Sequence, residues 1–138
     1  GSQAWALLAL AAPNSSTGIS SGDIDSFIDD DSSSGQRKSR MLVAGLAGLD
    51  KIGEGALDQY DGRLGVNITA ESRWTRMIDK AAAVNNRALV AMLAGLGMQG
   101  ASWDRMTARH LYHIVSALRR VGLDAEARMI AAEAVARA

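Results

Sequence analysis

Apolar residues recur every three or four positions along most of this 138-residue chain, which is the spacing of one face of an α-helix. The clearest stretch covers 107–121, where leucine, isoleucine and valine alternate with arginine, histidine and serine. Gly122 ends this stretch, and a second helical pattern follows from Asp124 to about Ala138. The pattern therefore predicts an antiparallel helical hairpin at the end of the sequence.

Two further hairpins are expected earlier in the chain. One starts after Thr69, a suitable N-cap, and turns at the asparagine pair 85–86. The other starts near Met41, and glycines shorten its second helix to about two turns. A separate helix, ended by Pro13, opens the chain, and we expect it to pack on the hairpins because isolated helices of fewer than about 12 residues are marginal in water.

Four of these predicted helices contain a similar short sequence motif, in which a large apolar residue, an alanine or serine, and a leucine precede a helix breaker. The four copies of the motif occupy 6–10, 42–46, 89–93 and 114–118. Their unequal spacing disfavours a regular repeat array. We therefore predict an all-α fold of divergent helical hairpins, arranged as a short α-solenoid or a helical bundle.

The stretch 14–35 has a different composition, dominated by serine, glycine and aspartate. Such a composition buries too little apolar surface to offset the entropy of ordering the chain. We therefore predict a disordered acidic loop, which divides the chain into three parts. These are an N-terminal helix packed on the body (1–13), a disordered Ser/Asp-rich linker (14–35) and a helical-hairpin body (36–138).

Composition and charge limit the range of possible functions. The absence of cysteine excludes disulfides and thiolate metal sites. A formal net charge of zero disfavours nucleic acid as a partner, and the longest apolar run is too short for a membrane span. The two parts of the chain carry opposite net charges, because the linker holds five aspartates and no basic residue, whereas every lysine and arginine lies in the body. The sequence pattern predicts neither the oligomeric state nor the cellular compartment.

No arrangement typical of a catalytic site is present, so we predict a protein that is not an enzyme and has no cofactor. His110 and His113 are the only histidines, and neighbouring arginines oppose a cation, so we expect no metal there. The acidic stretch 23–31 lacks the central glycine and the final glutamate of an EF-hand, which disfavours a calcium loop.

The candidate binding residues fall in two regions. Large apolar residues at helical spacing in the acidic linker are typical of a docking motif, and aromatic or charged residues in and just before the last hairpin are suited to a protein interface. The candidate partner-binding residues are Ile24, Phe27, Ile28, Trp103, Arg109, Tyr112 and His113.

The segment from His110 to Ala134 reads HLYHIVSALRRVGLDAEARMIAAEA. It resembles the last hairpin of tetratricopeptide-like helical-repeat domains, and also the C-terminal ends of uncharacterised proteobacterial proteins. The resemblance implies a helical-repeat fold with a protein-binding surface, and it implies no catalytic residue in this chain.

We accordingly predict a non-catalytic protein-interaction or scaffold module of a larger bacterial protein, which binds a partner helix or segment in a helical groove. The leading Gly1-Ser2 is typical of a cloning scar, so we expect the chain to be a fragment. Two alternatives stay open. One is a helical accessory domain of an envelope hydrolase, such as a lytic transglycosylase, with catalysis elsewhere. The other is a self-regulating domain whose acidic arm docks on the body.

Overall fold

The structure, a computed structural model, describes residues 2–13, 18–68, 70–99 and 103–138. Within those ranges the chain forms eight α-helices, two short 3-10 helices and no strand, which confirms the all-α prediction. The elements are α1 (Gln3–Ala11), α2 (Ser21–Asp30), η1 (Ser34–Gln36), α3 (Arg37–Gly48), α4 (Glu54–Leu64), α5 (Arg73–Ala83), α6 (Arg87–Gln99), η2 (Trp103–Arg105), α7 (Ala108–Arg120) and α8 (Asp124–Arg137).

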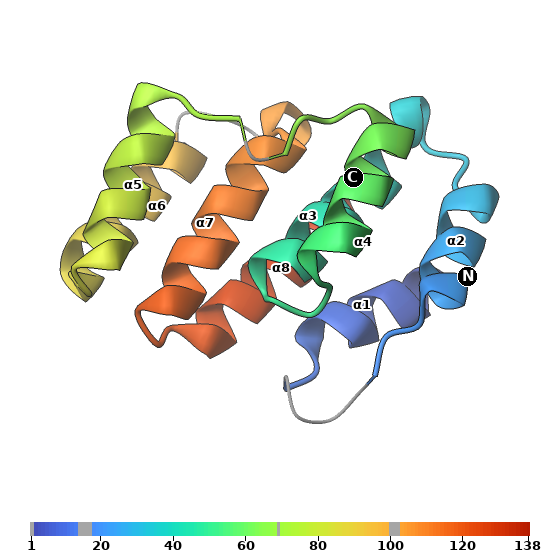
Figure 1. The fold of residues 1–138 in the computed structure, drawn as a ribbon, viewed down its shortest axis with the longest axis horizontal. Helices are drawn as coiled ribbons and strands as arrows, with labels where there is room; N and C mark the ends of the chain where they lie inside the picture. The colour runs from blue at the N-terminus through green and yellow to red at the C-terminus, as the bar shows by residue number, and fades with distance from the viewer. Residues whose placement is uncertain (1, 14–17, 69, 100–102) are drawn as a thin grey trace.

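The helices pack into one bundle around a shared core. Figure 1 shows α5 and α6 at one end of the molecule and α1 and α2 at the opposite end. Between them α3, α7 and α8 pack against one another, and α1 contacts both α8 and α3. The buried apolar side chains form a single cluster, to which α3 and α7 contribute Leu42, Leu46, Leu111 and Ile114.

Two glycines of α3 allow this close packing. A Cβ atom at Gly45 would lie 2.9 Å from Cδ2 of Leu10 and 3.1 Å from Cβ of Ala131, so α1 and α8 both approach the α3 backbone there. A Cβ atom at Gly48 would lie 2.9 Å from Cβ of Val115 on α7. The glycines are thus explained by packing, because a side chain at either position would push a neighbouring helix away.

The last predicted hairpin is confirmed by α7 and α8. The Thr107 side chain accepts a hydrogen bond from the His110 backbone N–H at the start of α7. Between the two helices Gly122 adopts a φ of 84°, a left-handed conformation that favours glycine. Local signals were sufficient here because both ends of α7 carry standard helix-ending residues.

Two helix boundaries differ from the prediction. Helix α5 begins at Arg73 rather than directly after Thr69, which lies outside the described residues. Its N-cap is Ser72, which exchanges hydrogen bonds with Thr75 in a capping box. Helix α4 is longer than two turns because Leu57, Tyr60 and Leu64 all bury against the body, and this burial offsets the cost of its internal glycines.

The prediction of a disordered acidic loop is corrected by α2. Ser20 caps this helix, and Ile24, Phe27 and Ile28 form a buried stripe along one face. Average composition concealed the stripe, because aspartate and serine occupy the opposite face and three apolar residues at helical spacing are sufficient for docking. Residues 14–17 of the predicted linker lie outside the described residues.

Helix α1 packs on the body and is fixed at its C-terminal end. The Lys51 ammonium group donates hydrogen bonds to the carbonyl oxygens of Ala9 (2.6 Å) and Ala12 (2.7 Å). Arg128 Nη1 donates to the carbonyl oxygen of Ala11 (3.1 Å). Two cations therefore satisfy the last carbonyl groups of this short helix. None of the described helices, α1 included, is both long enough and apolar enough to cross a membrane.

Candidate functional site

A groove of about 440 Å³ lies between α1 and α8 on the surface of the bundle. All but two of its lining residues are apolar, the exceptions being Arg128 and Glu133. Leu8 of α1 and Met129 of α8 both lie in it, with 69% and 64% of their surfaces exposed. We call this feature the α1–α8 groove. Large apolar side chains so exposed, in one continuous groove, are typical of a binding surface.

The groove exists because α8 is apolar on two faces. Ala127, Ala131, Ala134 and Val135 face the core. The outer face carries a second row of apolar residues, spaced four, three and four positions apart, which is the spacing of a helix-packing surface. This row consists of Ala125, Met129, Ala132 and Ala136. Ala125, Met129 and Ala136 of this row are exposed, and Ala132 is half-buried against the core.

The two polar residues of the groove are already engaged within the chain. Arg128 donates to the carbonyl oxygens of Ala11 (3.1 Å) and Asp124 (3.3 Å). Glu133 accepts a hydrogen bond from Arg137. Both charged side chains still line the groove, beside alanine, leucine and methionine.

Three of the predicted partner-binding residues contact the body of this chain. Ile24, Phe27 and Ile28 are buried, and the Phe27 ring lies 6.1 Å from the ring of Trp5 on α1. Polar contacts reinforce the docking of α2, because the Tyr60 hydroxyl donates to the carbonyl oxygen of Ser21 (3.2 Å). In this arrangement the stripe stabilises the domain itself.

Two aspartates on the acidic side of α2 pair with one arginine. Arg63 of α4 contacts Asp25 (Nη1 to Oδ1, 3.3 Å) and Asp29 (Nη2 to Oδ1, 2.7 Å). All three side chains are at least 41% exposed. The opposed charges of the acidic stretch and the body therefore meet at Arg63.

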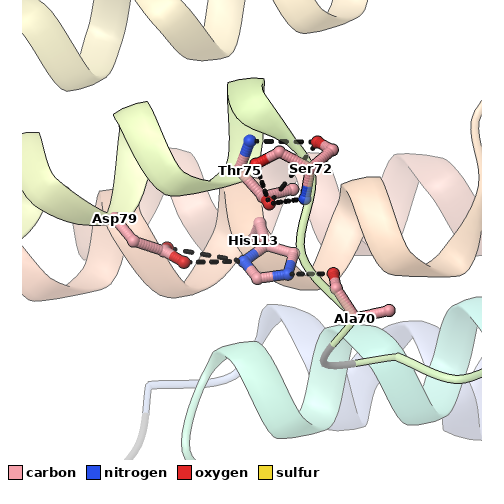
Figure 2. A network of polar contacts seen from close by, with 5 residues as sticks. All are labelled: Ala70, Ser72, Thr75, Asp79 and His113. Atoms are coloured by element: carbon pink, nitrogen blue, oxygen red, sulfur yellow. Dashed lines mark hydrogen bonds and ion pairs between the residues drawn. The ribbon is translucent and has the colours of Figure 1, made fainter.

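His113 belongs to a buried network that joins α7 to α5 (Figure 2). Its side chain is buried, with Nδ1 3.1 Å from Oδ2 of Asp79 and Nε2 3.3 Å from the carbonyl oxygen of Ala70. Both partners are hydrogen-bond acceptors, and each lies within hydrogen-bond distance of one ring nitrogen. Figure 2 shows the Ser72–Thr75 capping box beside this pair, where α5 begins. These contacts give His113 a structural role.

The remaining predicted residues are half-buried and do not share one surface. The Tyr112 ring packs edge-on against His113 (5.2 Å), and burial, followed by the charge of Asp79, raises the pKa of its phenol. Trp103 lies in η2 with the Arg137 guanidinium 5.8 Å from its ring centre. Arg109 lines a separate cavity at the start of α7.

The structure thus brings the seven predicted residues to four different places, and the α1–α8 groove contains none of them. The signal that would have found the groove is the second apolar row of α8, which is readable in the sequence but resembles ordinary core. No group of three or more His, Asp or Glu side chains in the described part of the chain could hold a metal ion.

No family model, curated protein or solved structure matches this chain.

Proposed function

We propose that this domain is a non-catalytic protein-interaction or scaffold module that binds an amphipathic helix of a partner protein in the α1–α8 groove. The observation that carries the proposal is the exposure of Leu8 and Met129 within a groove whose polar residues are already paired. Covering the two side chains would contribute about 1.5–3 kcal/mol for each one fully buried.

The spacing of the outer row on α8 favours a helix as the ligand. Helices pack by placing residues three and four positions apart into the gaps of a neighbouring helix, and the row from Ala125 to Ala136 offers such gaps. Its alanines let a second backbone approach closely. A partner with leucine or methionine at matching intervals would complete the packing.

The resemblance to tetratricopeptide-like repeats supports the same proposal. The segment that carries it forms α7 and α8, and α8 supplies one wall of the groove. Helical repeats bury their apolar faces by stacking, so an unpaired outer face on the last hairpin is a natural place for a further helix. In this proposal the domain is part of a larger bacterial protein.

Self-regulation by the acidic arm is a second candidate, favoured by the docking of α2. The arm packs its buried apolar stripe beside Trp5 on α1, and on its outer side it forms exposed ion pairs to Arg63, which contribute little stability each. A partner that displaced α2 would gain access to the side of α1 that carries Trp5. Hydrogen exchange at 21–30 tests this candidate, because exchange must accelerate when the partner binds.

A matched set of variants tests the groove. Leu8→Glu and Met129→Glu place a charge in the groove, whereas Met92→Glu places one on α6 at a residue of similar exposure. In affinity capture from the source cells, we expect a stoichiometric partner with wild type and Met92→Glu and its loss with both groove variants. Sedimentation of the purified protein checks whether the ligand is a second copy. Equal capture by all four proteins would refute the proposal.

A further inference from the structure

Three arginines converge on a cavity of about 260 Å³ where the starts of α3 and α7 meet the end of α4. Figure 1 shows that α4 ends and α7 begins at the same edge of the molecule. Arg37 and Arg40 come from the first turn of α3, and Arg109 comes from the first turn of α7. Among the described residues that line this cavity there is no acid, and Thr107 contributes a hydroxyl group. We call it the arginine cavity.

Two of the three guanidinium groups in the arginine cavity have no ion-pair partner in the part of the chain that the structure describes. Nε of Arg40 and Nε of Arg109 are buried without a hydrogen bond. No described residue forms an ion pair with either guanidinium group. Arg37 is fixed from behind, because its Nη2 donates to the carbonyl oxygens of Trp103 and Met106 (2.8 Å for Met106). A buried donor without an acceptor is costly, and the cost is greater for a charged group.

Helix ends make unequal contributions to the potential. The first turn of α3 contains two arginines, but the Asp31 carboxylate accepts a hydrogen bond from its Ser39 backbone N–H (2.9 Å) and offsets the dipole of this helix. The start of α7 also lines the cavity, so the positive end of a second helix dipole lies there. Burial lowers the pKa of the neighbouring His110, and Arg109 and His113 lower it further.

We propose that the arginine cavity binds a phosphate group carried by a small molecule. The guanidinium fork matches pairs of oxygen atoms on such a group, and the three arginines that line the cavity supply the positive charge to hold a dianion. The volume is just below the roughly 300–1,000 Å³ of sites for drug-sized ligands, which indicates a compact ligand. This site is separate from the α1–α8 groove and does not depend on it.

Calorimetric titration at constant ionic strength tests the proposal, with inorganic phosphate and glycerol phosphate as probes and sodium chloride as the blank. We expect saturable binding of one phosphate group per chain. Arg40→Met and Arg109→Met should each weaken binding by about tenfold or more, because each removes charge-assisted hydrogen bonds. Arg63→Met removes the same charge outside the cavity and should bind as wild type does.

The His110 imidazole provides a second readout by proton NMR. A bound anion offsets the charge of Arg109, so the pKa of His110 should rise when phosphate is added, and it should not rise in Arg40→Met. Arg40→Lys, which keeps the charge but loses the fork, should give intermediate affinity and serves if Arg40→Met does not fold. Absence of saturable binding, or equal weakening by Arg63→Met, would overturn the proposal. Much tighter binding of a phosphoserine peptide than of glycerol phosphate would overturn its small-molecule part.

Discussion

The apolar stripe of α2 and the apolar side chains of the α1–α8 groove differ in exposure, and the compositions of their helices do not predict the difference. Phe27 of the acidic helix α2 is only 4% exposed, whereas Leu8 of α1, an almost wholly apolar helix, is 69% exposed. Helix α2 has one apolar face and needs one partner, which the body supplies. Helix α8 has two apolar faces, and the body covers one of them. Thus the number of apolar faces per helix matters more than overall hydrophobicity for locating an unpartnered surface.

The sharpest test of this contrast compares two truncations. Phe27→Ala should lower the free energy of unfolding by about 3–5 kcal/mol, because it removes a buried aromatic ring and leaves a cavity. Leu8→Ala should change it by about 0.5 kcal/mol or less, since the side chain is mostly in water. Urea unfolding measures both. Equal losses of stability would show that the α2 stripe and the groove side chain contribute alike to folding, which would contradict the contrast.

The docked arm should also depend on Asp31, directly after α2. Its carboxylate accepts hydrogen bonds from the backbone N–H and hydroxyl groups of Ser33 and of Ser39, which joins α2 to α3. Asp31→Ala should cost about 1–3 kcal/mol, because these donors lose a charged acceptor. Unfolding at neutral pH measures the loss, and Asp58→Ala, at an exposed carboxylate of α4, is the control.

The contribution of Asp31 should depend on pH. Burial raises the pKa of its carboxyl group, but the hydrogen bonds from Ser33 and Ser39 outweigh burial and lower it below 3.8 overall. The resulting stabilisation is complete above the ordinary aspartate range and is lost as the pH falls through the lowered value. The stability gap between wild type and Asp31→Asn should therefore shrink below about pH 4. A gap that stays constant down to pH 2 would contradict this account.

The smallest effect is expected at Arg63, which pairs with the acidic face of α2 in solvent. Arg63→Met should cost about 1 kcal/mol or less, because exposed ion pairs gain little over hydration. Salt should reduce the difference, since surface charges are screened. Unfolding at low and high sodium chloride measures it. A large, salt-insensitive loss would mean that charge, rather than the apolar stripe, holds the arm.

The sequence was sufficient where local signals define an element. Thr107 and Gly122 mark the ends of α7, and Asn85, which has a φ of 55°, marks the turn between α5 and α6. The order of α2 escaped prediction because its stabilising contacts, Trp5 and Tyr60, come from distant parts of the chain. The arginine cavity escaped for the same reason.

The groove was missed for a different reason. Met129 lies on a helical stripe whose spacing is that of a buried face. The packed structure shows that a different face of α8 contacts the core. A two-faced apolar helix is therefore identifiable from sequence, but the face that stays exposed is decided by its tertiary neighbours.

The central claim is that the α1–α8 groove is the surface that holds a partner helix. The most direct measurement is photo-crosslinking in the source cells, with p-benzoylphenylalanine placed at Met129 or, as a matched control, at the similarly exposed Met92 of α6. The account predicts one discrete adduct with another protein from position 129, its loss when Leu8→Glu is added, and no such adduct from position 92. The same adduct from both positions, or none from position 129, would contradict it.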